Sequence, residues 1–143
     1  MKNLSKFMVL AVLVIAVFLY VQINKAYTKI IDINWSISLP TSYKEIYSID
    51  SGASFHGDGE RYHIFQYAKE SDINQSVNWK NNKDEYIETE IDKVLSSLNV
   101  RKENMPNFQS NYKYYTIGKD DNSKIYLIFT TDSKKLYVVE DIY

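Results

Sequence analysis

The chain contains no cysteine, and its larger part has no excess of positive charge. With no Cys among 143 residues, a disulfide scaffold, thiolate chemistry and a lipoprotein cleaved before a cysteine are all excluded. The first 29 residues hold four lysines and no acid, so residues 30–143 contain 13 of the 17 basic residues and all 18 acidic ones. An acidic body of this kind is a poor nucleic-acid binder and is repelled by anionic lipid headgroups.

The longest apolar run lies near the start of the chain. Residues 7–23 read FMVLAVLVIAVFLYVQI, and lysines flank the run on both sides. Because a helix rises about 1.5 Å per residue, a run of this length spans about 25 Å, the short end of what crosses a bilayer. We therefore predict an uncleaved transmembrane helix. The residues expected to contact lipid are Phe7, Val9, Leu13, Ile15, Phe18 and Leu19.

The alternatives to an anchor are a cleaved signal peptide and a buried helix. The run is long for a signal peptide, and no good small-x-small cleavage site follows it. The predicted organisation is a cytoplasmic tail (1–6), the anchor (7–23), a short linker (24–29) and one folded domain (30–143). We expect the domain to lie outside the cell membrane, although the charge bias across the span is weak.

The rest of the chain predicts an α+β domain with an antiparallel sheet, in the order β-β-β-α-β-β-β. Period-2 alternation, turn residues and β-branched or aromatic residues indicate six strands, at 30–39, 43–50, 61–68, 111–117, 124–130 and 136–143. The strand at 124–130 is apolar on both faces, so it should be covered on both sides, on one of them by the helix.

One helix is predicted between the third and fourth strands. A single stripe of apolar residues recurs at helical spacing, formed by Ile87, Ile91, Val94, Leu95 and Leu98. Asn82 and Glu85 resemble a capping box at the start, and Asn99 suits a left-handed stop.

The only cluster with the residue types of a site is the glycine-rich segment around His56. His56, Asp58 and Glu60 are candidates for acid–base chemistry, and His56, Asp58 and His63 are candidates for a metal site. The pair Asp58-Gly59 predicts a two-residue hairpin turn, which would place both histidines on one face of the hairpin. The simpler interpretation is a structural turn with exposed polar residues, and a partner-recognition loop is a third. A serine triad is not expected, because one loop does not supply its geometry.

Tyrosine is unusually frequent, with 13 copies. Tyr112 and Tyr114 share one face of a predicted strand, where packing within the sheet is the simpler interpretation and a protein-binding surface the alternative. Trp35 and Trp79 are expected to pack in the core or at an edge, and the acids of the later turns to be solvated.

Four segments carry a resemblance to a known group of proteins. They are FHGDGE at 55–60, LSSLNV at 95–100, and the tail segments DDNSKIYL at 120–127 and KLYVVEDI at 135–142. In these residues the chain resembles small membrane-anchored proteins of low-GC Gram-positive bacteria. The resemblance implies a bacterial source and one compact domain. It brings no established activity, so no catalytic residue is carried over.

The sequence thus favours a protein that acts by binding another protein, as an immunity or accessory factor, and it leans away from an enzyme. The alternative is a metal-dependent or acid–base hydrolase centred on His56 and Asp58, and a purely structural role is a third option. The expected partners are membrane lipid, through the first helix, and a second protein. No cofactor is expected.

Overall fold

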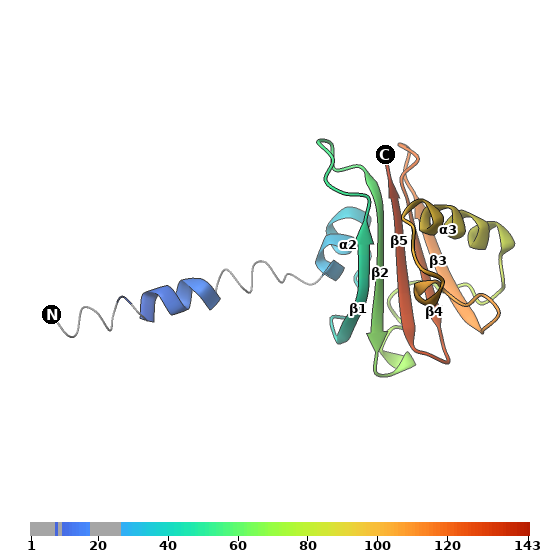
Figure 1. Ribbon diagram of the computed structural model, residues 1–143. Helices are drawn as coiled ribbons and strands as arrows, with labels where there is room; N and C mark the ends of the chain where they lie inside the picture. The colour runs from blue at the N-terminus through green and yellow to red at the C-terminus, as the bar shows by residue number, and fades with distance from the viewer. Residues whose placement is uncertain (1–7, 9, 18–26) are drawn as a thin grey trace.

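The computed structural model describes residues 8, 10–17 and 27–143, and its centre is a five-stranded antiparallel sheet (Figure 1). The order of the strands across the sheet is β1-β2-β5-β4-β3. Their bounds are β1 Tyr43–Asp50, β2 Gly59–Tyr67, β3 Tyr112–Gly118, β4 Lys124–Thr130 and β5 Lys135–Ile142. The last strand therefore inserts between the two hairpins and joins them into one sheet.

Each face of the sheet is covered by a different set of segments, and Figure 1 shows the two labelled helices on opposite sides. Helix α3 (Glu85–Ser97) packs on one face through the predicted apolar stripe, with Ile91 and Leu95 fully buried. Helix α2 (Tyr27–Trp35), the irregular segment 36–40 and the segment 73–79 cover the other face. Two short 3-10 turns complete the fold, η1 (Glu70–Asp72) and η2 (Lys102–Asn104).

The C-terminal half of the domain lies where the sequence patterns place it. Strands β3, β4 and β5 match the three predicted strands within one or two residues. Residues 125–130 of β4 are buried, with α3 on one side and α2 on the other. The helix begins after Asp84, whose carboxylate accepts hydrogen bonds from the backbone of Tyr86 and Ile87, so the cap is not the expected Asn82. Asn99 adopts the left-handed conformation with φ 54°.

The predicted strand at 30–39 is wrong, because its first half is helical. Alternation at Ile31, Ile33 and Trp35 suggested a strand, but Ile31 and Trp35 are also four residues apart and share one face of a helix. Helix α2 buries these two residues and leaves Ile33 71% exposed. At Ser36, which has a φ of 55°, the chain leaves the helix, and it then buries Ile37 and Leu39. Two strands therefore precede α3, not three, and residues 27–29 of the expected linker belong to α2.

The predicted anchor is also corrected. Residues 7, 9 and 18–23 of the expected span lie outside the described residues, and residues 8 and 10–17 are helical. Within the part of the chain that the structure describes, no helix has both the length and the apolar character that a bilayer crossing requires. The fold class of a transmembrane helix plus a domain is thus contradicted, and so is the placement at a membrane. Among the residues expected to contact lipid, only Leu13 and Ile15 are described.

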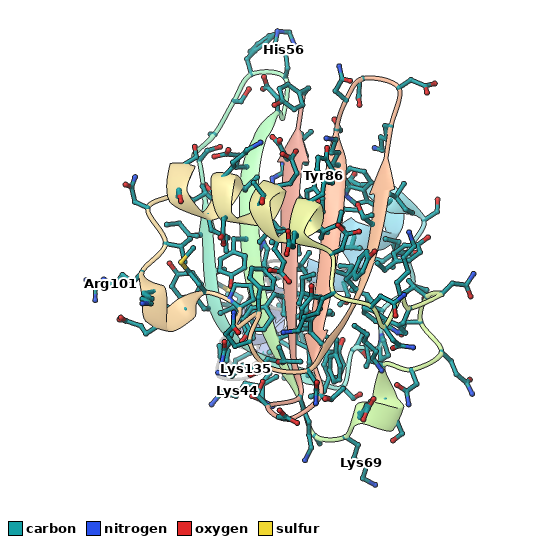
Figure 2. All side chains as sticks on the ribbon, turned by 90° about the vertical axis from the view of Figure 1, so that its right-hand side faces the viewer. Lys44, His56, Lys69, Tyr86, Arg101 and Lys135 are labelled. Carbon is teal, nitrogen blue, oxygen red and sulfur yellow. The ribbon has the colours of Figure 1, made fainter. Side chains whose placement is uncertain are left out.

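The hairpin between β1 and β2 has a wider loop than predicted. Asp50 pairs with Arg61, and the backbone N–H of Ser51 donates to Glu60 O at 2.9 Å, so residues 51–58 form the connection. Gly59 has a φ of 125°, and a Cβ there would lie 2.3 Å from Ser51 Oγ, so only glycine fits. We call residues 51–58 the β1–β2 loop. Figure 2 shows His56 at its tip, at the opposite end of the sheet from Lys69.

Candidate functional site

The two histidines that were candidates for one metal site lie apart in the structure. His56 is exposed in the loop, whereas His63 lies within β2, opposite Ser48 in β1. His63 stacks on the ring of Tyr27 in α2 with 3.5 Å between the ring centroids, and its Nδ1 lies 2.5 Å from Glu45 Oε1. Within the described residues, no group of three His, Cys, Asp or Glu side chains could hold a metal ion.

The loop also lacks the hydrogen bonds between a histidine ring and a carboxylate or hydroxyl that acid–base catalysis would use. The hydroxyl of Ser54 donates to the carboxylate of Asp58, and the backbone N–H of His56 donates to Ser54 Oγ at 3.3 Å. The His56 ring contacts the ring of Phe55 edge-on, and no hydrogen bond in the described structure joins this imidazole to Ser54 or Asp58. Asp58 therefore supports the loop, without orienting a histidine as a base in a triad does.

Glu60, the third catalytic candidate, belongs to the ladder of the sheet. It pairs with Asp141 of β5, and burial together with the nearby charge of Glu60 raises the pKa of Asp141. This pair of carboxyls lies in a different environment from the exposed His56 at the loop tip.

Tyr112 and Tyr114 lie beneath the start of α3, where both rings are buried. Tyr112 donates to Glu88 Oε1 at 2.6 Å, and Tyr114 donates to Asp84 Oδ2 at 2.9 Å. Burial and the hydrogen bond to Glu88 raise the pKa of Tyr112 to about 12, and the hydroxyl of Tyr114 lowers the pKa of Asp84. A partner that used this sheet face would have to displace α3.

A different group of residues gathers around the base of the β1–β2 loop. A hollow of about 340 Å³ is lined by Asn34, Trp35, His56, Gly57, Arg61, Lys119 and Ile142. Nη2 of Arg61 donates to Gly57 O at 2.8 Å, and the ammonium of Lys119 lies 4.5 Å from the centroid of the Trp35 ring. We call this feature the basic hollow, because its ionisable lining residues are an arginine, a lysine and a histidine.

Trp35 is held in place by the buried carboxylate of Glu140, which was not predicted from the sequence. Glu140 is 0% exposed; one oxygen accepts from Trp35 Nε1 at 2.6 Å and the other accepts from the hydroxyl of Tyr27. Burial, the charge of Glu140 and the hydrogen bond to it raise the pKa of Tyr27 well above its usual range. Glu140 thus ties both ends of α2 to β5 and sets the Trp35 ring in the wall of the basic hollow.

A second buried charge lies on the same face of the sheet, near its opposite end. Lys113 of β3 is 6% exposed, and its ammonium donates to Glu70 Oε1 at 3.1 Å and to Asn74 Oδ1. The same ammonium lies 5.5 Å from the Trp79 ring centroid and 5.0 Å from that of Phe129. The alternation of strand 111–117 places Lys113 on the face opposite Tyr112, which is the only sequence signal for its position.

Comparison of the chain with protein-family models, with curated proteins and with solved structures gave no match.

Proposed function

We propose that the domain is a protein-binding module that holds its partner with the β1–β2 loop and the basic hollow. The observation that carries the proposal is Phe55, which is 98% exposed at the tip of the loop. Its aromatic contact is with the ring of its neighbour His56. Single exposed apolar side chains are common, but aromatic residues are enriched at the centres of protein interfaces.

The basic hollow supplies the polar half of the proposed interface. Arg61 and Lys119 bring two permanent positive charges to it, although the described domain is acidic overall. The one buried carboxylate nearby, Glu140, already accepts hydrogen bonds on both oxygens. The hollow therefore suits a carboxylate of the partner, which Arg61 can bind through its remaining N–H groups.

The groups around the hollow are held in place before any partner binds. Arg61 is anchored to the loop backbone at Gly57, and Lys119 lies over a tryptophan that Glu140 fixes. Such preorganisation reduces the entropy lost on binding. We therefore infer that the partner presents an apolar pocket for Phe55 next to an acidic side chain. Whether that partner makes the protein an immunity or an accessory factor stays a prediction.

The test is site-specific photo-crosslinking in cells that express the full chain, with benzoylphenylalanine in place of Phe55. The matched control carries the same group in place of Tyr86, an exposed aromatic residue on the outside of α3 (Figure 2). We expect one discrete protein adduct from position 55, none from position 86, and loss of the adduct when Lys119→Glu is added.

The protein identified in the adduct is then purified and its affinity for the chain is measured. We expect Phe55→Ser to weaken binding at least about tenfold, as the loss of an interface anchor does. The same adduct from both positions, or an affinity that Phe55→Ser leaves unchanged, would overturn the proposal.

A further inference from the structure

A second hollow lies at the opposite end of the same sheet face, around Lys113. Its volume is about 490 Å³, within the range of small-molecule sites. It opens between the segment that follows η1 and the edge strand β3. The lining residues are Glu70, Asn74, Trp79, Asn81, Asn111, Tyr112, Lys113 and Thr131. We call this feature the amide hollow, because three of its lining residues are asparagines.

The floor of the amide hollow is held by several side-chain contacts. The buried ammonium of Lys113 is held by Glu70 and Asn74, and it lies against the rings of Trp79 and Phe129. Trp79 is fixed in turn, because its Nε1 donates to Ile73 O at 3.0 Å. The adjacent backbone of Lys80 pairs with Tyr114 in both directions, at 2.8 and 2.9 Å, which secures the segment along the edge of β3.

The charge of the lining excludes an ionic ligand. Lys113 and Glu70 pair with each other at 3.1 Å, so the positive charge of one cancels the negative charge of the other. Because this pair is neutral overall, an anion or a cation would gain no net attraction from it and would still lose its hydration. The basic hollow differs in this respect, since no carboxylate is among its lining residues.

The polar groups of the lining exclude an apolar ligand as well. The amides of Asn81 and Asn111 each offer two N–H donors and a carbonyl acceptor, and Thr131 adds a hydroxyl. Asn74 offers its N–H donors, since its Oδ1 already accepts from Lys113. An apolar molecule would leave these groups without partners, at a cost of about 1–3 kcal/mol for each group that it buries. The matching ligand is neutral, carries donors and acceptors at high density, and has a C–H face that can lie against Trp79.

We propose that the amide hollow is a binding site for a neutral saccharide. Hydroxyl groups of a sugar both donate and accept, as the amides require, and the ring C–H groups supply the apolar face. The proposal is independent of the protein-binding function, because the two hollows share no lining residue.

The chain's two tryptophans make the test specific to one hollow. Trp79 lines the amide hollow and Trp35 lines the basic hollow. Full-length protein is labelled with 5-fluorotryptophan, the two ¹⁹F resonances are assigned with Trp79→Phe, and neutral saccharides (maltose, cellobiose and N,N′-diacetylchitobiose) are titrated in. Glucuronate and glucosamine serve as the anionic and cationic comparators.

We expect at least one neutral saccharide to shift the Trp79 resonance in a saturable manner and to leave the Trp35 resonance in place. Asn111→Ala, at an exposed lining position, should weaken that binding about tenfold, as the loss of one or two hydrogen bonds does. The matched control is Asn82→Ala, an exposed neighbour of the lining residue Asn81 that should change nothing.

Three results would overturn the proposal. They are an unmoved Trp79 resonance with every neutral saccharide at about 50 mM, far above a Kd of about 1 mM; a shift with the charged comparators alone; and a shift that survives Asn111→Ala. A shift of Trp35 alone would place binding in the basic hollow and would also count against the amide hollow.

Discussion

Glu140 and Lys113 are buried charges on the same face of one sheet, and they are stabilised by partners of different kinds. Both oxygens of Glu140 accept from neutral donors, Tyr27 and Trp35, and no base lies within ion-pair distance of it in the described residues. Lys113 instead pairs with a carboxylate, that of Glu70, whose side chain is 45% exposed.

The two arrangements fasten the two segments that cover this face. Helix α2 makes no β-ladder with the sheet, and Glu140 supplies two hydrogen bonds that hold it. The segment after η1 has only the pairing of Lys80 with Tyr114, and Lys113 supplies its second attachment. The two sites differ in what happens to the partners if the charge is removed. The carboxylate of Glu70 is 45% exposed and can return to water, whereas the N–H of Trp35, in a residue that is 5% exposed, cannot. Loss of a buried charge is thus costly only where its hydrogen-bond partners cannot reach water.

The largest effect is expected from Glu140→Leu. The substitution leaves the buried Trp35 N–H and the half-buried Tyr27 hydroxyl without their acceptor, and Arg61 loses the negative charge opposite it in the sheet. Each neutral donor left without an acceptor costs about 1–3 kcal/mol, so the two together should cost about 2–6 kcal/mol. Urea unfolding should show this loss, and Glu140→Gln, which keeps one acceptor, should lose less. Equal stabilities for Glu140→Leu and the unmodified chain would contradict the role of Glu140.

Tyr27→Phe tests the same cluster through its dependence on pH. Burial and Glu140 raise the pKa of Tyr27 in the folded protein, so the folded state holds the phenolic proton more tightly than the unfolded state does. The resulting stability is fully present below pH of about 10, the unperturbed value, and falls as the pH rises above it. We expect Tyr27→Phe to lower the free energy of unfolding by about 1.5–3 kcal/mol at pH 7. Above a pH of about 10 the free energy of unfolding of the variant should fall less steeply, because one ionisable group is gone.

The measurement is the urea midpoint of both proteins from pH 7 to pH 11.5. Part of the alkaline fall should remain in the variant, since the pKa of Tyr112 is raised to about 12 on the other face of the sheet. Parallel curves for the two proteins would show that Tyr27 does not contribute to the alkaline loss.

Lys113→Met should be milder than either change. Methionine fills a similar volume against the rings of Trp79 and Phe129, and Glu70 is exposed enough to be rehydrated. Replacement of a buried charge by an apolar residue of similar size is often close to neutral, so we expect a loss of about 1 kcal/mol or less. A loss as large as that of Glu140→Leu would remove the distinction drawn between the two charges.

The elements that the sequence predicted correctly are those whose patterns admit one interpretation. The stripe from Ile87 to Leu98 fits only a helix, and β4 is too short and too β-branched for one. Helix α2 was missed because the spacing of Ile31 and Trp35 satisfies both periods. The span at 7–23 was predicted from composition and length, which specify an apolar segment and not the extent of a helix.

The sites were harder to predict because their partners lie far apart along the chain. Lys113 and Glu70 are separated by 43 residues, and Trp35 and Glu140 by 105. Local pattern predicts that a lysine or a glutamate is solvated. The basic hollow depends in the same way on four segments that meet only in the folded protein. The glycines of the β1–β2 loop predicted a turn but not the length of the loop.

The smallest effect on stability is expected from Phe55→Ser. Because the side chain is 98% exposed, its removal should change the free energy of unfolding by no more than about 0.5 kcal/mol. The matched comparison is Phe65→Ser, at a fully buried position of β2, which should be severely destabilising. Urea unfolding of both variants compares the free energy of unfolding lost at Phe65, which folding requires, with that lost at Phe55, which folding does not require. A loss near 2 kcal/mol for Phe55→Ser would mean that the loop packs against Phe55, and the residue would then no longer support a binding role.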